Sequence, residues 1–295
     1  MTLQKKATVV STSVAALLTI IKLVVGIASG SVAVLASAVD SVLDMFVSIF
    51  NYFAIHNAEK PADHNFNYGR GKIEALASVI EGTIITLSGI FLLYQAIKKA
   101  INGEVSTYLN ESLIIMVVSL VITIALVMYL NYVAKKTDSM VIKADALHYK
   151  TDVYTNAAVL VSLVLVSFTE YEIIDVLVGG GISIFIIYSA YELIQEGVLV
   201  LLDKSVEEEK VDEIKTIIES EDRVNAYHML KTREAGSQIF VDVHLVFDCI
   251  ITLMDAHRVT DKIEDQIKLI DDNKDWVINI HMDPYDDFII NDEGQ

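Results

Sequence analysis

The sequence predicts a membrane α-helical bundle of six transmembrane helices, followed by a cytoplasmic α+β domain of ferredoxin-like type with the element order αββαβ. Hydrophobic residues make up 53% of the 295 residues, a proportion typical of membrane proteins. Apolar segments near the ~20 residues that cross a bilayer follow one another up to residue 203. From residue 204 onward, charged residues become frequent and the periodicity changes to that of short helices and strands.

Six segments have the length and hydropathy of membrane-spanning helices. They cover roughly residues 8–29, 32–57, 73–100, 110–134, 141–168 and 174–200. The breaks between them are turn-like or charged, such as Gly30-Ser31, the loop EKPADHNFNYGRGK and the segment KKTDS. We therefore assign residues 1–203 to a membrane domain and residues 204–295 to a cytoplasmic domain.

Basic residues fall mainly on one side of the predicted spans. On that side lie Lys5, Lys6, Lys60, Arg70, Lys72, Lys135, Lys136 and Lys143, whereas the opposite loops are mainly acidic. Lys98 and Lys99 are exceptions, placed near the outer end of the third span. By the positive-inside rule, we expect both termini to be cytoplasmic.

The cytoplasmic segment has the pattern of a small α+β domain. Helical periodicity covers residues 206–220 and 253–270, and strand-like alternation covers residues 226–234, 238–247 and 276–284. In the middle strand, Ile239, Val241, Val243 and Leu245 share one face, so His244 lies on the other. This order predicts a ferredoxin-like sandwich.

Charge and cysteine content exclude several classes of protein. The formal net charge is −18, and the acidic residues are concentrated in the last third of the chain. This charge argues against a nucleic-acid partner and is compatible with attracting cations. The single cysteine, Cys249, excludes an intrachain disulfide framework and a cysteine-rich site for soft metals.

Two pairs of ionisable residues lie inside otherwise apolar spans. Asp40 and Asp44 are four positions apart in the second span, and His148 and Asp152 are four positions apart in the fifth. Residues at this spacing share one helical face. At 1.5 Å per residue the two pairs lie roughly 10–18 Å into the membrane and overlap near its midplane. We expect them to form a four-ligand cage for a divalent metal.

The alternative is that these polar residues are ordinary interhelical hydrogen-bond partners. We assign that role to Asn51, Asn156, Ser48 and Ser162, while ionisable residues within a membrane indicate a functional site. Asp145 precedes His148 by three residues. It either lines the cytoplasmic entrance to the cage or favours the N-terminal turn of its helix, and we favour the entrance.

The chemistry of such a cage links metal to protons. Three ionised carboxylates near mid-membrane are costly, so some ligands should carry protons when no metal is bound. Metal binding needs deprotonated carboxylates and a neutral imidazole, so loading releases protons. This is the physical basis of metal/proton antiport, with His148 as the natural group to change protonation near neutral pH.

The motifs DSVLD, PADHNFNYGRGKIEALA, ADALHYKTDVYTN and LLDKS resemble those of the cation diffusion facilitator family, in its bacterial YiiP-like branch of zinc, cadmium and ferrous-iron exporters. The resemblance covers nearly the whole chain. It implies a homodimer in the bacterial inner membrane, with a transport site at Asp40, Asp44, His148 and Asp152.

The resemblance also implies a two-metal regulatory cluster in the cytoplasmic domain, completed across the dimer interface. Its matching positions are His228, His244, His257, His281 and Asp283. A charge interlock near the dimer axis matches Lys72 and Asp203, for which the alternative is simple juxtamembrane charge. The alternative for the histidines is a set of unrelated surface residues.

A further metal site of the family, in the loop between the second and third spans, is incomplete here. Asp63 matches, but the two histidine positions hold Phe66 and Arg70, and a cation at Arg70 would repel a metal. His64 could replace a missing ligand, or it could form a solvated pair with Asp63. Both alternatives stay open.

These observations predict a secondary transporter and not an enzyme: a Zn²⁺ exporter that exchanges metal for protons by alternating access. Oxygen and imidazole ligands also suit Cd²⁺, Fe²⁺ or Mn²⁺, and the affinity order favours zinc over iron and manganese. An iron exporter and a transport-inactive membrane metal sensor are the alternatives. An intramembrane metalloenzyme is disfavoured, because no HExxH pair accompanies the cage. The physiological metal, the proton stoichiometry and the role of the cytoplasmic metals do not follow from the sequence.

Overall fold

The computed structural model describes the chain over residues 1–29, 32–102, 110–169 and 173–286. Its contacts divide the chain into two compact units, Met1–Val198 and Leu199–Gln295. The second unit includes residues 287–295, which belong to the predicted cytoplasmic domain but lie outside the described residues.

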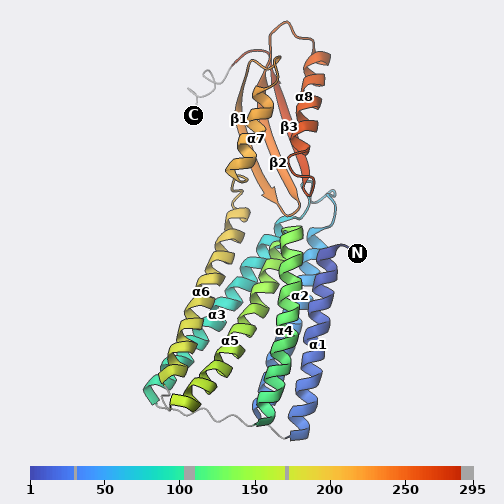
Figure 1. Cartoon of the computed structure of the whole chain (residues 1–295). Helices are drawn as coiled ribbons and strands as arrows, with labels where there is room; N and C mark the ends of the chain where they lie inside the picture. Colours follow the sequence, from blue (N-terminus) through green and yellow to red (C-terminus); the bar gives the residue numbers. More distant parts are fainter. Residues whose placement is uncertain (30–31, 103–109, 170–172, 287–295) are drawn as a thin grey trace. The chain divides into compact units, whose positions relative to one another are not determined.

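The first unit is a helical bundle whose helices lie alongside one another (Figure 1). The helices are α1 (Leu3–Ser29), α2 (Val32–Ala58), α3 (Lys72–Asn102), α4 (Asn110–Thr137), α5 (Met140–Thr169) and α6 (Ile173–Leu201). Each of the six expected spans lies inside one of these helices. The predicted fold class is confirmed.

Five helices of the described part of the chain are long and apolar enough to cross a membrane, namely α1, α2, α3, α4 and α6. Helix α5 has sufficient length but is not among them. Its N-terminal half carries Lys143, Asp145, His148, Lys150 and Asp152. The helix that departs from a plain apolar composition is therefore the one that brings two of the expected ligands.

Small residues allow close packing inside the bundle. Ala54 of α2, Ala77 of α3 and Ala146 of α5 belong to one buried cluster around Tyr149 and Leu130. The outer surface of the bundle is apolar, with exposed side chains on every helix, including Ile27, Phe46, Leu87, Val121, Val161 and Ile184. Such an apolar exterior is suited to lipid and not to water.

The second unit contains α7 (Glu208–Glu219), β1 (Ala226–Ala235), β2 (Gln238–Val246), α8 (Leu253–Lys268) and β3 (Asp275–Asp283). The three strands form one sheet in the order β1-β2-β3, with β1 and β2 antiparallel and β2 and β3 parallel. A tight turn at Gly236, whose φ is 66°, joins β1 to β2. The expected order αββαβ is confirmed.

Both helices of this unit pack against one face of the sheet. Ile239, Val241, Val243 and Leu245 of β2 are buried there against residues of both helices, including Ile214 of α7 and Ile263 of α8. The predicted alternation of β2 is therefore correct. It leaves His244 on the opposite face, which no described helix of the unit covers.

Candidate metal sites

Three of the four ligands expected in the membrane meet in the bundle. Asp44 comes from α2, and His148 and Asp152 come from α5. Each offers one ligand atom, and these atoms all lie within 4.8 Å of one another. His148 Nε2 lies 3.1 Å from Asp44 Oδ1. A carboxylate pair and an imidazole at this separation can hold a divalent metal ion.

Asp40 lies outside this close group. It lines the same cavity of about 610 Å³ as Asp44, His148 and Asp152, and it is exposed. The cage is thus present as three adjoining ligands, with the fourth carboxylate one turn away on α2. Asp40 as a ligand stays a prediction.

Lys22 of α1 lines the same cavity and was missed by the sequence analysis. Its Nζ donates to Ser41 Oγ at 2.7 Å and to the Ser37 carbonyl oxygen at 3.4 Å, both on α2. Its ammonium group acts electrostatically on Asp44, Asp152 and Asp40. The signal was available, because a lysine in the middle of an apolar helix indicates a functional group just as an aspartate does.

Asp145 does not line an entrance in this structure. It is fully buried, and its Oδ1 accepts a hydrogen bond from Asn51 Nδ2 at 3.2 Å. The expected interhelical role of Asn51 is therefore confirmed. Ser48 is also interhelical, because its hydroxyl lies 2.8 Å from the Tyr149 hydroxyl of α5. Asn156 and Ser162 instead donate within α5, to the carbonyl oxygens of Asp152 at 2.7 Å and Ala158 at 2.8 Å.

The sheet of the second unit aligns three histidines. His228 pairs with His244 across β1 and β2, and His244 pairs with His281 across β2 and β3. The ring centroids of His228 and His244 are 5.0 Å apart, and those of His244 and His281 are 4.5 Å apart. The three side chains thus form a row across the uncovered face of the sheet.

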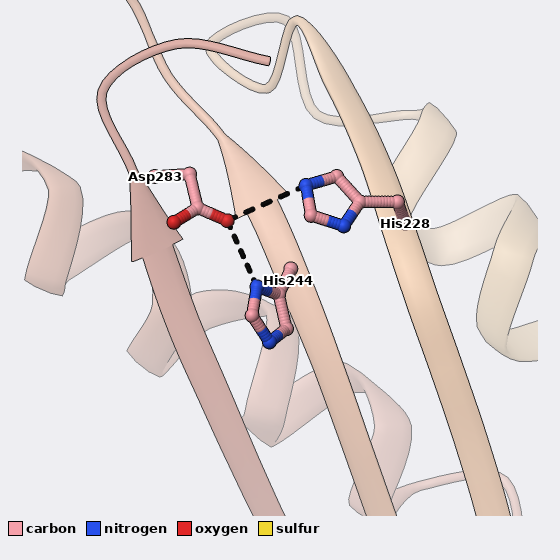
Figure 2. A group of neighbouring side chains, drawn as sticks. All are labelled: His228, His244 and Asp283. Carbon is pink, nitrogen blue, oxygen red and sulfur yellow. Dashed lines mark hydrogen bonds and ion pairs between the residues drawn. The ribbon is translucent and has the colours of Figure 1, made fainter. Parts of the chain in front are cut away.

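Asp283, at the end of β3, ties this row together. One carboxylate oxygen lies 2.9 Å from His244 Nδ1 and 3.4 Å from His228 Nε2 (Figure 2). The other oxygen lies 3.1 Å from His281 Nε2. His228, His244 and Asp283 each offer an atom to a group within 4.8 Å. The pairing of β1 with β2 is irregular directly after His228, near the start of β1, where Met229 has φ 54°.

His257 lies apart from the other four expected ligands. It is on α8, its side chain is 63% exposed, and its Nδ1 lies 3.7 Å from Asp261. The single chain therefore gathers four of the five expected positions. An exposed position of this kind is compatible with a ligand that completes a cluster between two copies of the chain. The metal-binding role of His257 stays a prediction.

The loop between α2 and α3 gives Asp63 partners other than a metal. Its carboxylate accepts from the backbone N–H groups of Asn65 and Phe66 and lies 2.6 Å from Arg70 Nη2. The Asn65 hydrogen bond and then the Arg70 guanidinium lower the pKa of Asp63. His64 is exposed. These contacts fit a loop held by an ion pair, and a metal at Asp63 and His64 would compete with Arg70.

The proposed charge interlock joins residues of two different units. Lys72 begins α3 in the first unit, and Asp203 follows α6 in the second. Within its own unit, Asp203 Oδ1 lies 3.2 Å from Arg233 Nη1, and Asp203 adopts φ 58°. The Lys72–Asp203 pair stays a prediction.

Comparison with known proteins gives two family matches along the chain. A model described as the cation efflux transmembrane domain matches residues 8–202. A second model, for the cytoplasmic domain of cation efflux proteins, matches residues 206–285. The chain belongs to the cation efflux, or cation diffusion facilitator, family. The expected family is thereby confirmed, and membership favours a transporter over an intramembrane enzyme.

Relatives within the cation efflux family align with the chain over nearly its full length. The cation-efflux pump FieF of Escherichia coli O139:H28 (strain E24377A / ETEC) is 35% identical over 282 residues, which cover 96% of this chain and 93% of the pump. FieF of Escherichia coli strain K12 / DH10B gives the same values. A crystal structure of the cytosolic domain of a cation diffusion facilitator family protein is 25% identical and covers 26% of this chain and 89% of that chain, with a TM-score of 0.24.

Proposed function

We propose that this member of the cation efflux family exports a divalent metal ion, Zn²⁺ above all, across the bacterial inner membrane in exchange for protons. The observation that carries the proposal is the group formed by Asp44, His148 and Asp152, whose ligand atoms lie within 4.8 Å of one another on a cavity inside the bundle. The 35% identity to the cation-efflux pump FieF supports it.

The contacts of the cage suggest how metal and protons exclude each other. The 3.1 Å contact between His148 Nε2 and Asp44 Oδ1 uses the same two atoms that would bind a metal. A metal ion therefore has to replace a proton held in that contact. Binding needs both carboxylates ionised and the imidazole neutral, so loading releases protons and unloading takes them up.

The ligand types favour zinc among the possible substrates. Two or three carboxylates and one imidazole suit Zn²⁺, and the same donors accept Cd²⁺, Fe²⁺ and Mn²⁺. The affinity order places zinc above iron and manganese at such a site. The exposed Cys249 in the second unit provides no thiolate to the cage.

The cytoplasmic cluster supports a homodimer that binds further metal. His228, His244, His281 and Asp283 would supply the ligands of one chain, and His257 would contribute where two copies meet. The distribution of lysine and arginine supports a cytoplasmic location of both termini. Alternating access of the bundle, with inward flow of protons driving metal outward, completes the proposed cycle.

Zinc flux into proteoliposomes under an imposed pH gradient tests the proposal. The comparison is between the full-length wild type, Asp152→Asn and the control Asp138→Asn. Asp138 follows α4, outside the cage, and pairs with Lys143 at 2.8 Å, so its variant makes the same chemical change away from the ligands. Flux should depend on the gradient in the wild type and in the control, and it should be lost in Asp152→Asn.

The cytoplasmic histidine row favours a membrane metal sensor as the second candidate. A sensor would bind zinc through this row without moving it through the bundle. If the wild type moves neither zinc nor Fe²⁺ nor Mn²⁺ while it binds metal in the second unit, the sensor is the better account of this chain.

A further inference from the structure

A second group of ionisable side chains lies inside the bundle, separate from the metal cage. Asn51 of α2, Glu81 of α3 and Asp145 of α5 are 0%, 1% and 0% exposed. Asn51 follows Asp44 by seven residues and Asp145 precedes His148 by three, which are roughly 10 Å and 5 Å along their helices. Because α2 and α5 run in opposite directions (Figure 1), both displacements are toward the same end of the bundle.

One amide group holds the two acids. Asn51 Nδ2 donates to Glu81 Oε2 at 3.0 Å and to Asp145 Oδ1 at 3.2 Å. This uses both of its N–H groups. Three buried oxygen atoms of the cluster then have no hydrogen-bond partner among the described residues: Asn51 Oδ1, Glu81 Oε1 and Asp145 Oδ2.

Such an arrangement requires a cation. Two ionised carboxylates and a bare carbonyl oxygen buried together repel one another, and each unpaired oxygen has lost its water. Two charged or titratable groups act on the Glu81–Asp145 pair, His148 of α5 and Asp44 of α2. Two hydroxyl groups also face it, those of Ser11 on α1 and Tyr149 on α5. Only His148 among these can be cationic, and it already contacts Asp44.

The available space favours a proton over a metal ion. The cavity of about 610 Å³ that holds the cage is lined by Tyr149, but by none of the three cluster residues. The cluster thus lies behind the cavity wall. A proton on one carboxyl adds almost no volume, and it converts an acceptor into a donor that can satisfy a second orphan oxygen.

We infer that Glu81 and Asp145, bridged by Asn51, bind one proton at a second cation site of the bundle, and that this proton leaves when metal enters the cage. The inference rests on the proposed function. A dication one helical turn from Asp145 repels a proton on the pair. The proton goes to water on metal loading and returns from water on metal release, so neither bonds nor electrons other than the O–H bond change.

Simultaneous measurement of zinc and proton flux in proteoliposomes tests the inference on the full-length protein. Glu81→Gln keeps the shape of the side chain and leaves the cage untouched, so zinc movement should persist. The number of protons counted per zinc ion should fall by about one. The matched control is Glu74→Gln. Glu74 is also buried on α3, two turns earlier, where it accepts from Ser139 Oγ at 2.5 Å, and its variant should keep the wild-type ratio.

Infrared spectroscopy of the purified full-length protein tests the pair without transport. Zinc added to metal-free wild type should diminish the protonated-carboxyl signal. Because cage carboxyls also release protons on loading, the loss should be smaller in Glu81→Gln and in Asp145→Asn than in the wild type by the contribution of the pair, and it should be unchanged in Glu74→Gln. The second substitution guards against a variant that fails to fold.

Failure of the inference and failure of the proposed function give different results. If the wild type moves zinc with protons but Glu81→Gln keeps the same ratio and the same infrared change, the pair holds no exchanged proton. If Glu81→Gln instead loses one bound metal ion per chain, the cluster is a metal site and the inference is wrong. If the wild type moves no zinc at all, the antiport proposal fails, while the infrared change still decides the pair.

Discussion

The metal cage of the bundle and the histidine row of the sheet are built from the same residue types in opposite proportions. The cage has two adjoining aspartates, a third one turn away and one histidine, with Lys22 on the same cavity wall. The row has three histidines and one aspartate, and Asp283 contacts all three rings. The cage thus brings three carboxylates together with one imidazole and one ammonium group inside an apolar bundle, whereas the row has a single carboxylate among three imidazoles.

This difference in composition determines what each site can do. A cage with excess carboxylate needs a cation at all times, whether metal, proton or ammonium, so its occupancy is coupled to other charges. A site with three imidazoles and one carboxylate gathers less like charge when metal leaves, because imidazole binds metal as a neutral ligand. The first arrangement suits transport, and the second suits a structural or regulatory site.

The largest effect should follow Asp44→Ala. The substitution removes the carboxylate that contacts His148, so zinc transport should fall by about 100-fold or more, while the second unit still binds metal. Flux in proteoliposomes and metal content of the purified protein measure the two sites separately. Transport close to the wild-type rate would remove the cage from the mechanism, and loss of both functions would erase the distinction between the sites.

Asp283→Ala should have a smaller effect on transport and a large effect on metal binding by the second unit. The row loses the carboxylate that joins its three rings, so zinc affinity of the second unit should fall about 10- to 100-fold while transport through the cage persists. Calorimetry of the full chain measures the affinity. Asp275→Ala, at the exposed opposite end of β3, should leave it unchanged. An equal loss in both variants would indicate damage to the strand and not to a metal site.

Removing the charge of Lys22 should have the opposite effect on the cage, namely tighter zinc binding. Lys22→Met keeps a long apolar side chain and removes the cation, so zinc should bind the cage more tightly, by about tenfold for a shift of ~1.4 kcal/mol at partial burial. Slower release would then lower the maximal flux. Lys98→Met, at an exposed position of α3, is the control. Weaker zinc binding in Lys22→Met would mean that Lys22 supports the cage through its hydrogen bond to Ser41 and not through its charge.

Features that depend on local sequence patterns could be predicted from the sequence, and features that depend on how helices pack against one another could not. Spacing of four residues on a helix fixes Asp44, His148 and Asp152 on inward faces, and alternation along β2 fixes the face of His244, because both patterns are local. The partners of Glu81 and the approach of Lys22 to the cavity depend on how α1 and α3 rotate against α2, which their own sequences do not specify. Asp145 was misplaced for the same reason, since its burial depends on Asn51 of another helix.

The loop between α2 and α3 should show the smallest effect, because its ion pair is exposed. The pKa of Asp63 is lowered, first by the Asn65 N–H and then by Arg70. The ionised carboxylate of Asp63 therefore stabilises the loop fully above the ordinary aspartate pKa of about 3.9. This stabilisation is lost only as the pH falls through the lower folded pKa. Hydrogen exchange at the Asn65 and Phe66 amides, which donate to Asp63, should therefore keep its protection down to about pH 4, relative to Asp63→Asn. Added zinc should not change that protection in the wild type and should change it in Arg70→His, where a ligand replaces the cation. A zinc response in the wild type would show that metal displaces Arg70 from Asp63. Metal binding at the loop would then be coupled to the movement of another charge, as it is at the cage.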